Sequence, residues 1–193
     1  MSMTSAVAGP GITGVILAGG RGSRMGGKDK GLVLYQNKPL YQHVLQRFAP
    51  QVTTVWINAN RNIEVYQQSG VPTIADTLSD FPGPLAGMLA ALQQAESEWV
   101  AFCSCDTPCV PSNLVSELWK NREQALAVWP RTEQRDHPTL ALLHRSLAAP
   151  LQDYLARGER KLMLFLQQVG GHSVLFAQAE AAFRNINQPE DLL

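Results

Sequence analysis

Residues 12–31 read ITGVILAGGRGSRMGGKDKG, an apolar segment that runs directly into a glycine-rich, basic loop. The apolar part, from Ile12 to Ala18, is short, rich in β-branched residues and followed by two glycines, which predicts a buried parallel strand. In open α/β sheets, ligands bind outside the carboxyl ends of the strands. We therefore expect the loop from Gly19 to Gly31 to lie at a ligand-binding site.

The glycines and the cations of this loop are suited to a polyphosphate. Successive glycines let backbone N–H groups approach an anion closely. The positive charges of the loop come from Arg21, Arg24, Lys28 and Lys30. The alternative interpretation is a flexible basic loop on the surface, with no ligand.

Two familiar nucleotide-binding motifs fit this loop only in part. Gly22, Gly27 and Lys28 match the start of a P-loop. However, Asp29 stands where Ser or Thr would hold Mg²⁺, and a carboxylate there would point negative charge at the phosphates. The dinucleotide-binding pattern G-x-G-x-x-G fails at Met25. We therefore exclude both motifs.

The rest of the chain alternates between strand and helix patterns. Strands are expected at residues 12–18, 52–58, 72–75, 99–103, 125–129, 137–143 and 173–176, and helices at 39–49, 61–69, 84–95, 111–122, 146–157 and 161–169. This alternation predicts an α/β fold with a three-layer, doubly wound, mostly parallel sheet. We expect residues 1–11 to be a disordered leader and residues 12–193 to form a single domain.

The composition argues against several classes of protein. The chain carries 16 Lys and Arg against 16 Asp and Glu, so its formal net charge is zero, unlike a generally basic nucleic-acid binder or a polybasic membrane-surface protein. No apolar run approaches the ~18–20 residues of a spanning helix, and the N-terminus lacks the features of a signal peptide. The three cysteines, all between residues 103 and 109, require no disulfide framework. We expect a cytoplasmic protein without nucleic-acid or membrane partners.

The zero net charge conceals a strong division along the chain. Residues 1–61 carry seven basic and one acidic side chain, and residues 62–119 carry seven acidic and no basic ones. The remaining residues carry nine basic and eight acidic side chains. A cationic loop is thus followed by an acidic segment, as expected of a site for a metal–triphosphate complex.

Asp106 is the most informative acidic residue. It follows a predicted buried strand, and Thr107 and Pro108 stiffen the turn that carries it. A carboxylate at a strand end that faces a triphosphate is a common Mg²⁺ ligand, because Mg²⁺ prefers hard oxygen ligands and shares them with phosphates. A zinc site at the neighbouring cysteines is excluded, since a structural zinc needs four ligands and a fourth cysteine is missing.

These motifs resemble those of the molybdenum cofactor guanylyltransferases, the MobA-type family of nucleotidyltransferases. The resemblance lies in LAGG at residues 17–20, RMGGKDKG at 24–31 and CDTP at 105–108. It implies a Rossmann-like nucleotidyltransferase fold, Mg²⁺ as cofactor, and transfer of GMP from GTP to the terminal phosphate of molybdopterin with release of pyrophosphate. The catalytic residues that it implies are Arg24 and Lys30, which act on the phosphates, and Asp106, which binds the metal.

The resemblance also implies a GTP-binding site on the first half of the chain. Its members are Leu17, Ala18, Gly19, Gly20, Lys30, Asn58, Asp76, Gly87 and Asp106. Sequence alone leaves two alternatives open: Asn58 could form a local Asx turn at the end of its strand, and the nearby Asp80 is better explained as a helix cap.

Asn185 and Asn187 lie in a C-terminal segment that resembles the family's ending, which implies a place on the side of the molybdopterin substrate. Arg160 and Lys161 are expected on the same side, because basic residues at the start of a helix oppose its dipole unless an anion is bound there. Simple solvation of the two basic side chains, and a turn before a terminal helix at the asparagines, are the alternatives. His137 is expected near the same side, without a role in proton transfer, because a phosphate nucleophile is already largely ionised at pH 7.

Two other functions stay open at this point. One is a cytidylyltransferase that acts on molybdopterin or on a small phosphorylated substrate, although LAGG is more typical of purine users within the family. The other is a non-catalytic GTP-binding chaperone for the cofactor. Further partners could be other proteins of molybdenum cofactor biosynthesis and of molybdoenzyme maturation.

Overall fold

The computed structural model describes residues 10–19, 27–78, 83–187 and 189–192. A seven-stranded sheet of order β5-β4-β1-β6-β8-β7-β9 runs through it. The strands are β1 (Ile12–Leu17), β4 (Thr54–Asn58), β5 (Thr73–Ile74), β6 (Trp99–Ser104), β7 (Ala127–Arg131), β8 (Leu142–His144) and β9 (His172–Leu175). Only β8 runs against its neighbours, so the predicted mostly parallel sheet is confirmed.

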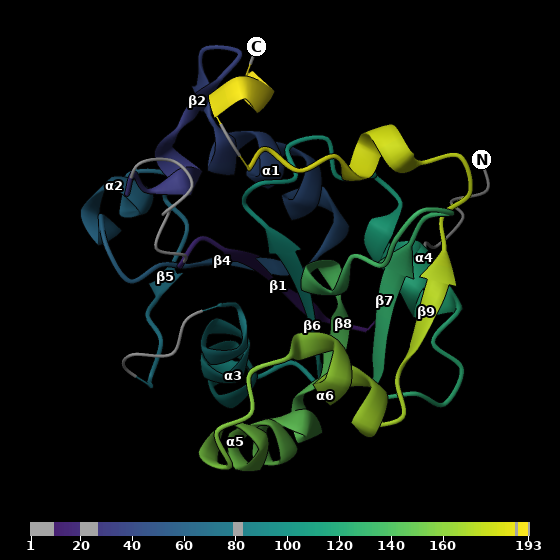
Figure 1. Cartoon of the computed structure of the whole chain (residues 1–193). Coiled ribbons are helices and arrows are strands. Elements are labelled where there is room, and N and C mark those ends of the chain that lie inside the picture. The colour runs from purple at the N-terminus through teal and green to yellow at the C-terminus, as the bar shows by residue number, and fades with distance from the viewer. Residues whose placement is uncertain (1–9, 20–26, 79–82, 188, 193) are drawn as a thin grey trace, which may run out of the picture.

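Within the described residues, six α-helices cover the two faces of the sheet (Figure 1). They are α1 (Leu40–Phe48), α2 (Ile63–Gln67), α3 (Leu85–Gln94), α4 (Leu114–Lys120), α5 (Ala148–Ala156) and α6 (Leu162–Gln168). One apolar core holds residues of α1, α2 and α4, and the other holds residues of α3, α5 and α6. The three-layer arrangement is therefore confirmed.

The central strand β1 explains why two cores form. All six of its residues are buried. Successive side chains of a strand point to opposite faces of the sheet, and both faces are covered by helices here. Ile12 and Ile16 belong to the core under α1, whereas Val15 and Leu17 belong to the core over α3. This burial on both faces accounts for the uninterrupted apolar run in the sequence.

Two local features differ from the sequence prediction. A small hairpin of β2 (Leu34–Tyr35) and β3 (Lys38–Pro39) was not predicted; its turn residues Gln36 and Asn37 take positive φ angles without a glycine. The strand predicted at 137–143 is instead a 3-10 turn over Pro138–Leu140 followed by β8. Proline lacks the N–H that a sheet ladder needs, which explains the change.

Two further expectations concern the N-terminal leader and membrane-spanning helices. The first nine residues of the predicted leader lie outside them. Within the described part of the chain, the helices are all too short or too polar to cross a bilayer.

We predict that Gly14→Ala destabilises the protein. A Cβ atom at Gly14 would lie 2.8 Å from both Phe48 Cε1 and Val52 Cγ2, so the core under α1 would have to shift. Overpacking of this kind costs about 1–3 kcal/mol, measurable as a lower midpoint of urea unfolding. Gly11→Ala is the matched control, since its nearest neighbour, Thr53 Oγ1, lies 4.0 Å away. Equal midpoints for the two variants would contradict the packing that we describe.

Candidate functional site

The site forms where three parallel strands end side by side. In the sheet, Leu17 at the end of β1 pairs with Asn58 of β4 on one side and with Ser104 of β6 on the other. The backbone continues this pairing for one more step, since Ala18 N donates to Asn58 O at 2.8 Å and Cys105 N donates to Leu17 O at 3.1 Å. The segments that follow these three strands therefore begin side by side at one edge of the sheet.

Asp106 lies at this edge and faces Lys30. The Lys30 Nζ atom is 3.4 Å from Asp106 Oδ2, and the two side chains are 23% and 14% exposed. The other oxygen, Oδ1, accepts from Ser104 Oγ at 2.6 Å and from Thr107 Oγ1 at 3.3 Å. The carboxylate is thus oriented mainly by the Ser104 hydroxyl at the end of β6, while its second oxygen faces the Lys30 ammonium of the glycine-rich loop.

The C-terminal segment closes over the same two residues. Asn187 Oδ1 accepts from Lys30 Nζ at 3.3 Å, and Asn185 Oδ1 accepts from Thr107 Oγ1 at 3.0 Å. Between these asparagines, the backbone N–H of Ile186 donates to the Asp106 carbonyl at 2.8 Å. Residues about 80 and 157 positions apart in the chain therefore share one cluster.

The oxygen atoms of this cluster fit a hard cation that takes most of its ligands from substrate and water. Mg²⁺ is usually held by one or two carboxylates together with phosphates and waters. Asp106 supplies one such carboxylate, partly exposed. The described residues contain no group of three or more His, Cys, Asp or Glu side chains placed to hold a metal ion by themselves.

The neighbouring cysteines do not compete for that cation. Cys103 and Cys105 are buried, and Cys109 is exposed. Burial, strengthened by the charge of Asp106, raises the pKa of both the Cys103 and the Cys105 thiol. These thiols stay protonated and pack as small apolar groups.

A second polar cluster gathers around Asp76, just after β5. Asp76 Oδ1 accepts from Asn58 Nδ2 and Oδ2 accepts from Asn60 Nδ2, both at 2.9 Å, and the Asp76 N–H donates to Asn60 Oδ1 at 2.9 Å. Asn58 also donates to the Ile74 carbonyl at 3.3 Å. The Asn58 side chain thus bonds across the sheet, in place of the local Asx turn that the sequence left open.

Two glycines make room for these asparagines. A Cβ atom at Gly87, in the first turn of α3, would collide with Asn58 Oδ1. A Cβ atom at Gly19 would lie 3.1 Å from Asn58 Oδ1 and 3.0 Å from Asn60 Nδ2. Asn60 was missed by sequence reasoning, although its position two residues after Asn58 repeats the spacing of Asn185 and Asn187.

Asp29 does not take the position that a P-loop comparison suggests. Its carboxylate is buried, 7% exposed, and accepts from Tyr66 OH at 2.7 Å, Asn62 Nδ2 at 3.0 Å and Gly31 N at 3.3 Å. The donors are the buried Tyr66 of α2, Asn62 at the start of α2, and the loop's own Gly31. The negative charge of Asp29 is therefore directed toward α2 and not toward the Lys30 ammonium.

A cavity of about 580 Å³ borders the C-terminal asparagines. Its lining includes Asn185, Asn187, Arg135 and His137. The His137 ring is 6% exposed and stacks on Phe183, with 4.8 Å between ring centroids. Burial lowers the pKa of His137, so the ring is neutral near pH 7, and its Nε2 atom is buried without a hydrogen-bond partner in the described part of the chain.

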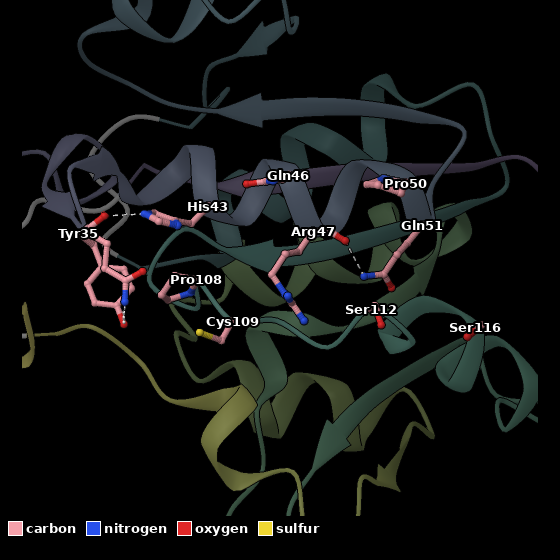
Figure 2. Close-up of a pocket in the computed structure, with 11 residues that line it drawn as sticks. Tyr35, His43, Gln46, Arg47, Pro50, Gln51, Pro108, Cys109, Ser112 and Ser116 are labelled. Carbon is pink, nitrogen blue, oxygen red and sulfur yellow. Dashed lines mark hydrogen bonds between the residues drawn. The ribbon is translucent and has the colours of Figure 1, made fainter.

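A larger hollow of about 780 Å³ lies between α1 and the segment that follows β6 (Figure 2). Several of its polar side chains are used to hold that segment. Arg47 Nε donates to the Val110 carbonyl at 2.7 Å, and Gln51 Nε2 donates to the Pro111 carbonyl at 2.8 Å. These bonds attach the segment that follows the Asp106 turn to helix α1 and to the 3-10 helix Ala49–Gln51 after it.

For four of the predicted site residues, the contacts described above decide nothing. Arg24 and Gly20 lie outside the described residues. Arg160 and Lys161 are exposed in the turn between α5 and α6, and the contacts reported above do not include them. Their participation stays a prediction.

Comparison with known proteins connects this geometry to one family. The model of the MobA-like NTP transferase domain matches residues 14–173. A protein of Yersinia pseudotuberculosis named molybdenum cofactor guanylyltransferase is 54% identical over 182 residues, which are 94% of this chain and 93% of the relative.

Solved structures give the same picture of the fold. Molybdopterin-guanine dinucleotide biosynthesis protein A from Archaeoglobus fulgidus is similar with a TM-score of 0.74 and 25% identity, over 93% of this chain and 94% of that one. CMP:2-keto-3-deoxy-manno-octonic acid synthetase, solved with CTP, is similar with a TM-score of 0.75 and 17% identity, over 94% and 95% of the two chains. At that identity the second likeness concerns the fold alone.

Proposed function

This chain belongs to the family of MobA-like NTP transferase domains, and on that basis we propose that it transfers GMP from GTP to the terminal phosphate of molybdopterin. The products are the molybdopterin guanine dinucleotide cofactor and pyrophosphate. The observation that carries the proposal is the meeting of Lys30, Asp106 and Asn187 at the carboxyl edge of the sheet. A phosphate-binding cation, a metal-binding carboxylate and the C-terminal segment are there combined in one site.

The reaction is a displacement at the α-phosphorus of GTP. An oxygen of the molybdopterin phosphate forms the new P–O bond, and the bond to the β-phosphate oxygen breaks, so that pyrophosphate leaves with the electron pair. The attacking phosphate is already largely ionised at pH 7 and needs no strong base. The protein therefore contributes positioning and electrostatic stabilisation.

Each residue of the site has a part in this reaction. Lys30 would donate to phosphate oxygens and stabilise charge on the departing pyrophosphate, together with Arg24 and the backbone N–H groups of the glycine-rich loop. Asp106 would hold Mg²⁺ through its carboxylate, oriented by Ser104. When bound, Mg²⁺ would neutralise phosphate charge and align the triphosphate.

Asn58 and Asp76 are proposed to bind the nucleoside part of GTP. Their mutual hydrogen bond leaves further lone pairs on the Asp76 carboxylate, which can accept from ribose hydroxyls or from base N–H groups. Leu17, Ala18 and Gly19 would approach the nucleotide through their backbone at the end of β1. Arg160 and Lys161 are proposed on the side of molybdopterin with Asn185 and Asn187.

The location and further partners stay predictions as well. A cytoplasmic location is supported by the three closely spaced thiols. Other proteins of molybdenum cofactor biosynthesis and molybdoenzyme maturation are the proposed protein partners.

Release of pyrophosphate tests the proposal directly. In the presence of Mg²⁺, we expect the protein to release pyrophosphate from GTP only when molybdopterin is added. A coupled phosphate assay measures the release. CTP in place of GTP tests for a cytidylyltransferase, because such an enzyme would turn over CTP faster than GTP. Binding of GTP without pyrophosphate release in the presence of molybdopterin would instead indicate a chaperone.

We predict that Asp106→Ala loses Mg²⁺-dependent turnover while it keeps the fold. Removal of one electrostatic contact to the reacting phosphates costs on the order of 10²–10³ in kcat. Asp153→Ala, which removes an exposed carboxylate on α5, is the control and keeps full activity. Circular dichroism melts compare the folds, and unchanged turnover in Asp106→Ala would exclude the metal assignment.

We predict that Gly87→Ala weakens GTP binding by about tenfold, because the new methyl group displaces Asn58 from Asp76. Calorimetric titration with GTP measures the effect. The double variant Asn58→Ala, Gly87→Ala supplies the control: without the Asn58 side chain there is no collision, so it should bind GTP as Asn58→Ala does. A further loss in the double variant would contradict this role of Gly87.

A further inference from the structure

The buried carboxylate of Asp29 accepts three hydrogen bonds near the site, and the proposed reaction gives it no task. It lies one residue before Lys30 and caps the short 3-10 helix Lys30–Leu32 by accepting from Gly31 N. Its remaining partners, Asn62 and Tyr66, come from the start and the middle of α2. A buried carboxylate is costly unless donors satisfy it, and here three donors do so.

The partners on α2 are themselves held in place. Tyr66 is fully buried, and burial together with the hydrogen bond to Asp29 raises the pKa of its hydroxyl, which therefore stays a donor. The Tyr66 hydroxyl occupies the space that a side chain at residue 31 would need, which explains the glycine there. A second bond between the same segments runs from Arg61 Nη1 to the Gly27 carbonyl at 2.8 Å.

These contacts constrain the backbone on both sides of Lys30. Asp29 is anchored through its side chain, and its carbonyl accepts from Leu32 N at 3.0 Å. The Lys30 carbonyl accepts from Val33 N at 3.1 Å. From this fixed backbone the Lys30 side chain reaches Asp106 and Asn187.

We propose that Asp29 is the positioning residue for Lys30: its buried carboxylate attaches the end of the glycine-rich loop to α2, so that the Lys30 ammonium is held beside Asp106 before the nucleotide binds. This inference rests on the proposed role of Lys30 as a phosphate contact. Glycine-rich segments lose much conformational freedom on ordering. An anchor that is already formed in the free protein reduces the part of that cost that falls on nucleotide binding.

An exchange of the two side chains tests the anchor. In Asp29→Asn, the bonds from Gly31, Tyr66 and Asn62 lose the negative charge of their acceptor, and the new amide nitrogen can pair with Asn62 only after the Asn62 amide turns over to present Oδ1. In Asn62→Asp alone, two carboxylates oppose each other. The double variant Asp29→Asn, Asn62→Asp restores one donor and one acceptor at unchanged net charge, and Asp tolerates the positive φ of 53° at position 62.

We expect each single variant to bind GTP at least about tenfold more weakly, and to lose a similar factor in kcat/KM for GTP, since a hydrogen bond to a charged group is worth this much. The double variant should return to within about threefold of the unmodified protein. Hydrogen exchange of residues 27–33 should accelerate in the single variants and slow again in the double variant. Asp153→Asn on α5 is the control for loss of one carboxylate.

A Lys30→Ala background separates positioning from mere stabilisation. If Asp29 acts through Lys30, Asp29→Asn lowers the melting temperature in this background but changes GTP affinity no further. A fall in melting temperature with unchanged GTP affinity of the folded Asp29→Asn protein overturns the proposal. So does tighter GTP binding, which would mean that Asp29 repels the phosphates.

The test of the role of Asp29 can be decided separately from the test of the proposed reaction. A protein that binds GTP but releases no pyrophosphate with molybdopterin contradicts the proposed reaction, while GTP affinity still decides the role of Asp29. If GTP does not bind at all, unchanged hydrogen exchange of residues 27–33 in Asp29→Asn overturns the anchor, and accelerated exchange that the double variant reverses supports it.

Discussion

The parallel pairing of β1 with both β4 and β6 is the constraint on which the rest of the structure depends. Leu17 has Asn58 on one side and Ser104 on the other, so three strands end at the same level. Backbone hydrogen bonds determine this register, and burial of β1 on both faces protects it, because a shift by one residue would exchange the two cores. The glycine-rich loop, the Asn58–Asp76 cluster and the Asp106 turn are brought together as a result.

The register of the strands places the charged side chains at this edge. Lys30 and Asp106 are partly exposed, and an ion pair in such a position adds little to the free energy of unfolding. Their value lies in placement, since a cation and a carboxylate face the same space at the end of the sheet. The zero net charge of the chain hides this arrangement, because the basic first third and the acidic segment that follows it cancel in the sum.

The sequence predicted the parts of the site that depend on local patterns. Asn58 ends a strand, and Asp76 and Asp106 each follow one; an apolar segment ended by polar residues is visible in the chain itself. Gly87 was expected at the GTP-binding site, and the structure adds that its missing side chain leaves room for Asn58. That role depends on a contact between residues 29 positions apart, which no local pattern contains. The hairpin at 34–39 escaped prediction because its turn takes positive φ angles without glycine.

Asp29 and Asp106 show why residue type alone does not determine the role of a carboxylate. Both lie next to Lys30, one in sequence and the other in space. Asp106 keeps one oxygen oriented by hydroxyl groups and offers the other to a cation, so it is suited to binding a metal. Both oxygens of Asp29 are used by donors from α2 and its own loop, and the side chain is almost fully buried. Tertiary contacts thus divide two identical groups between the proposed roles of ligand binding and loop anchoring, and the short helix α2 becomes part of what holds Lys30, the proposed phosphate contact.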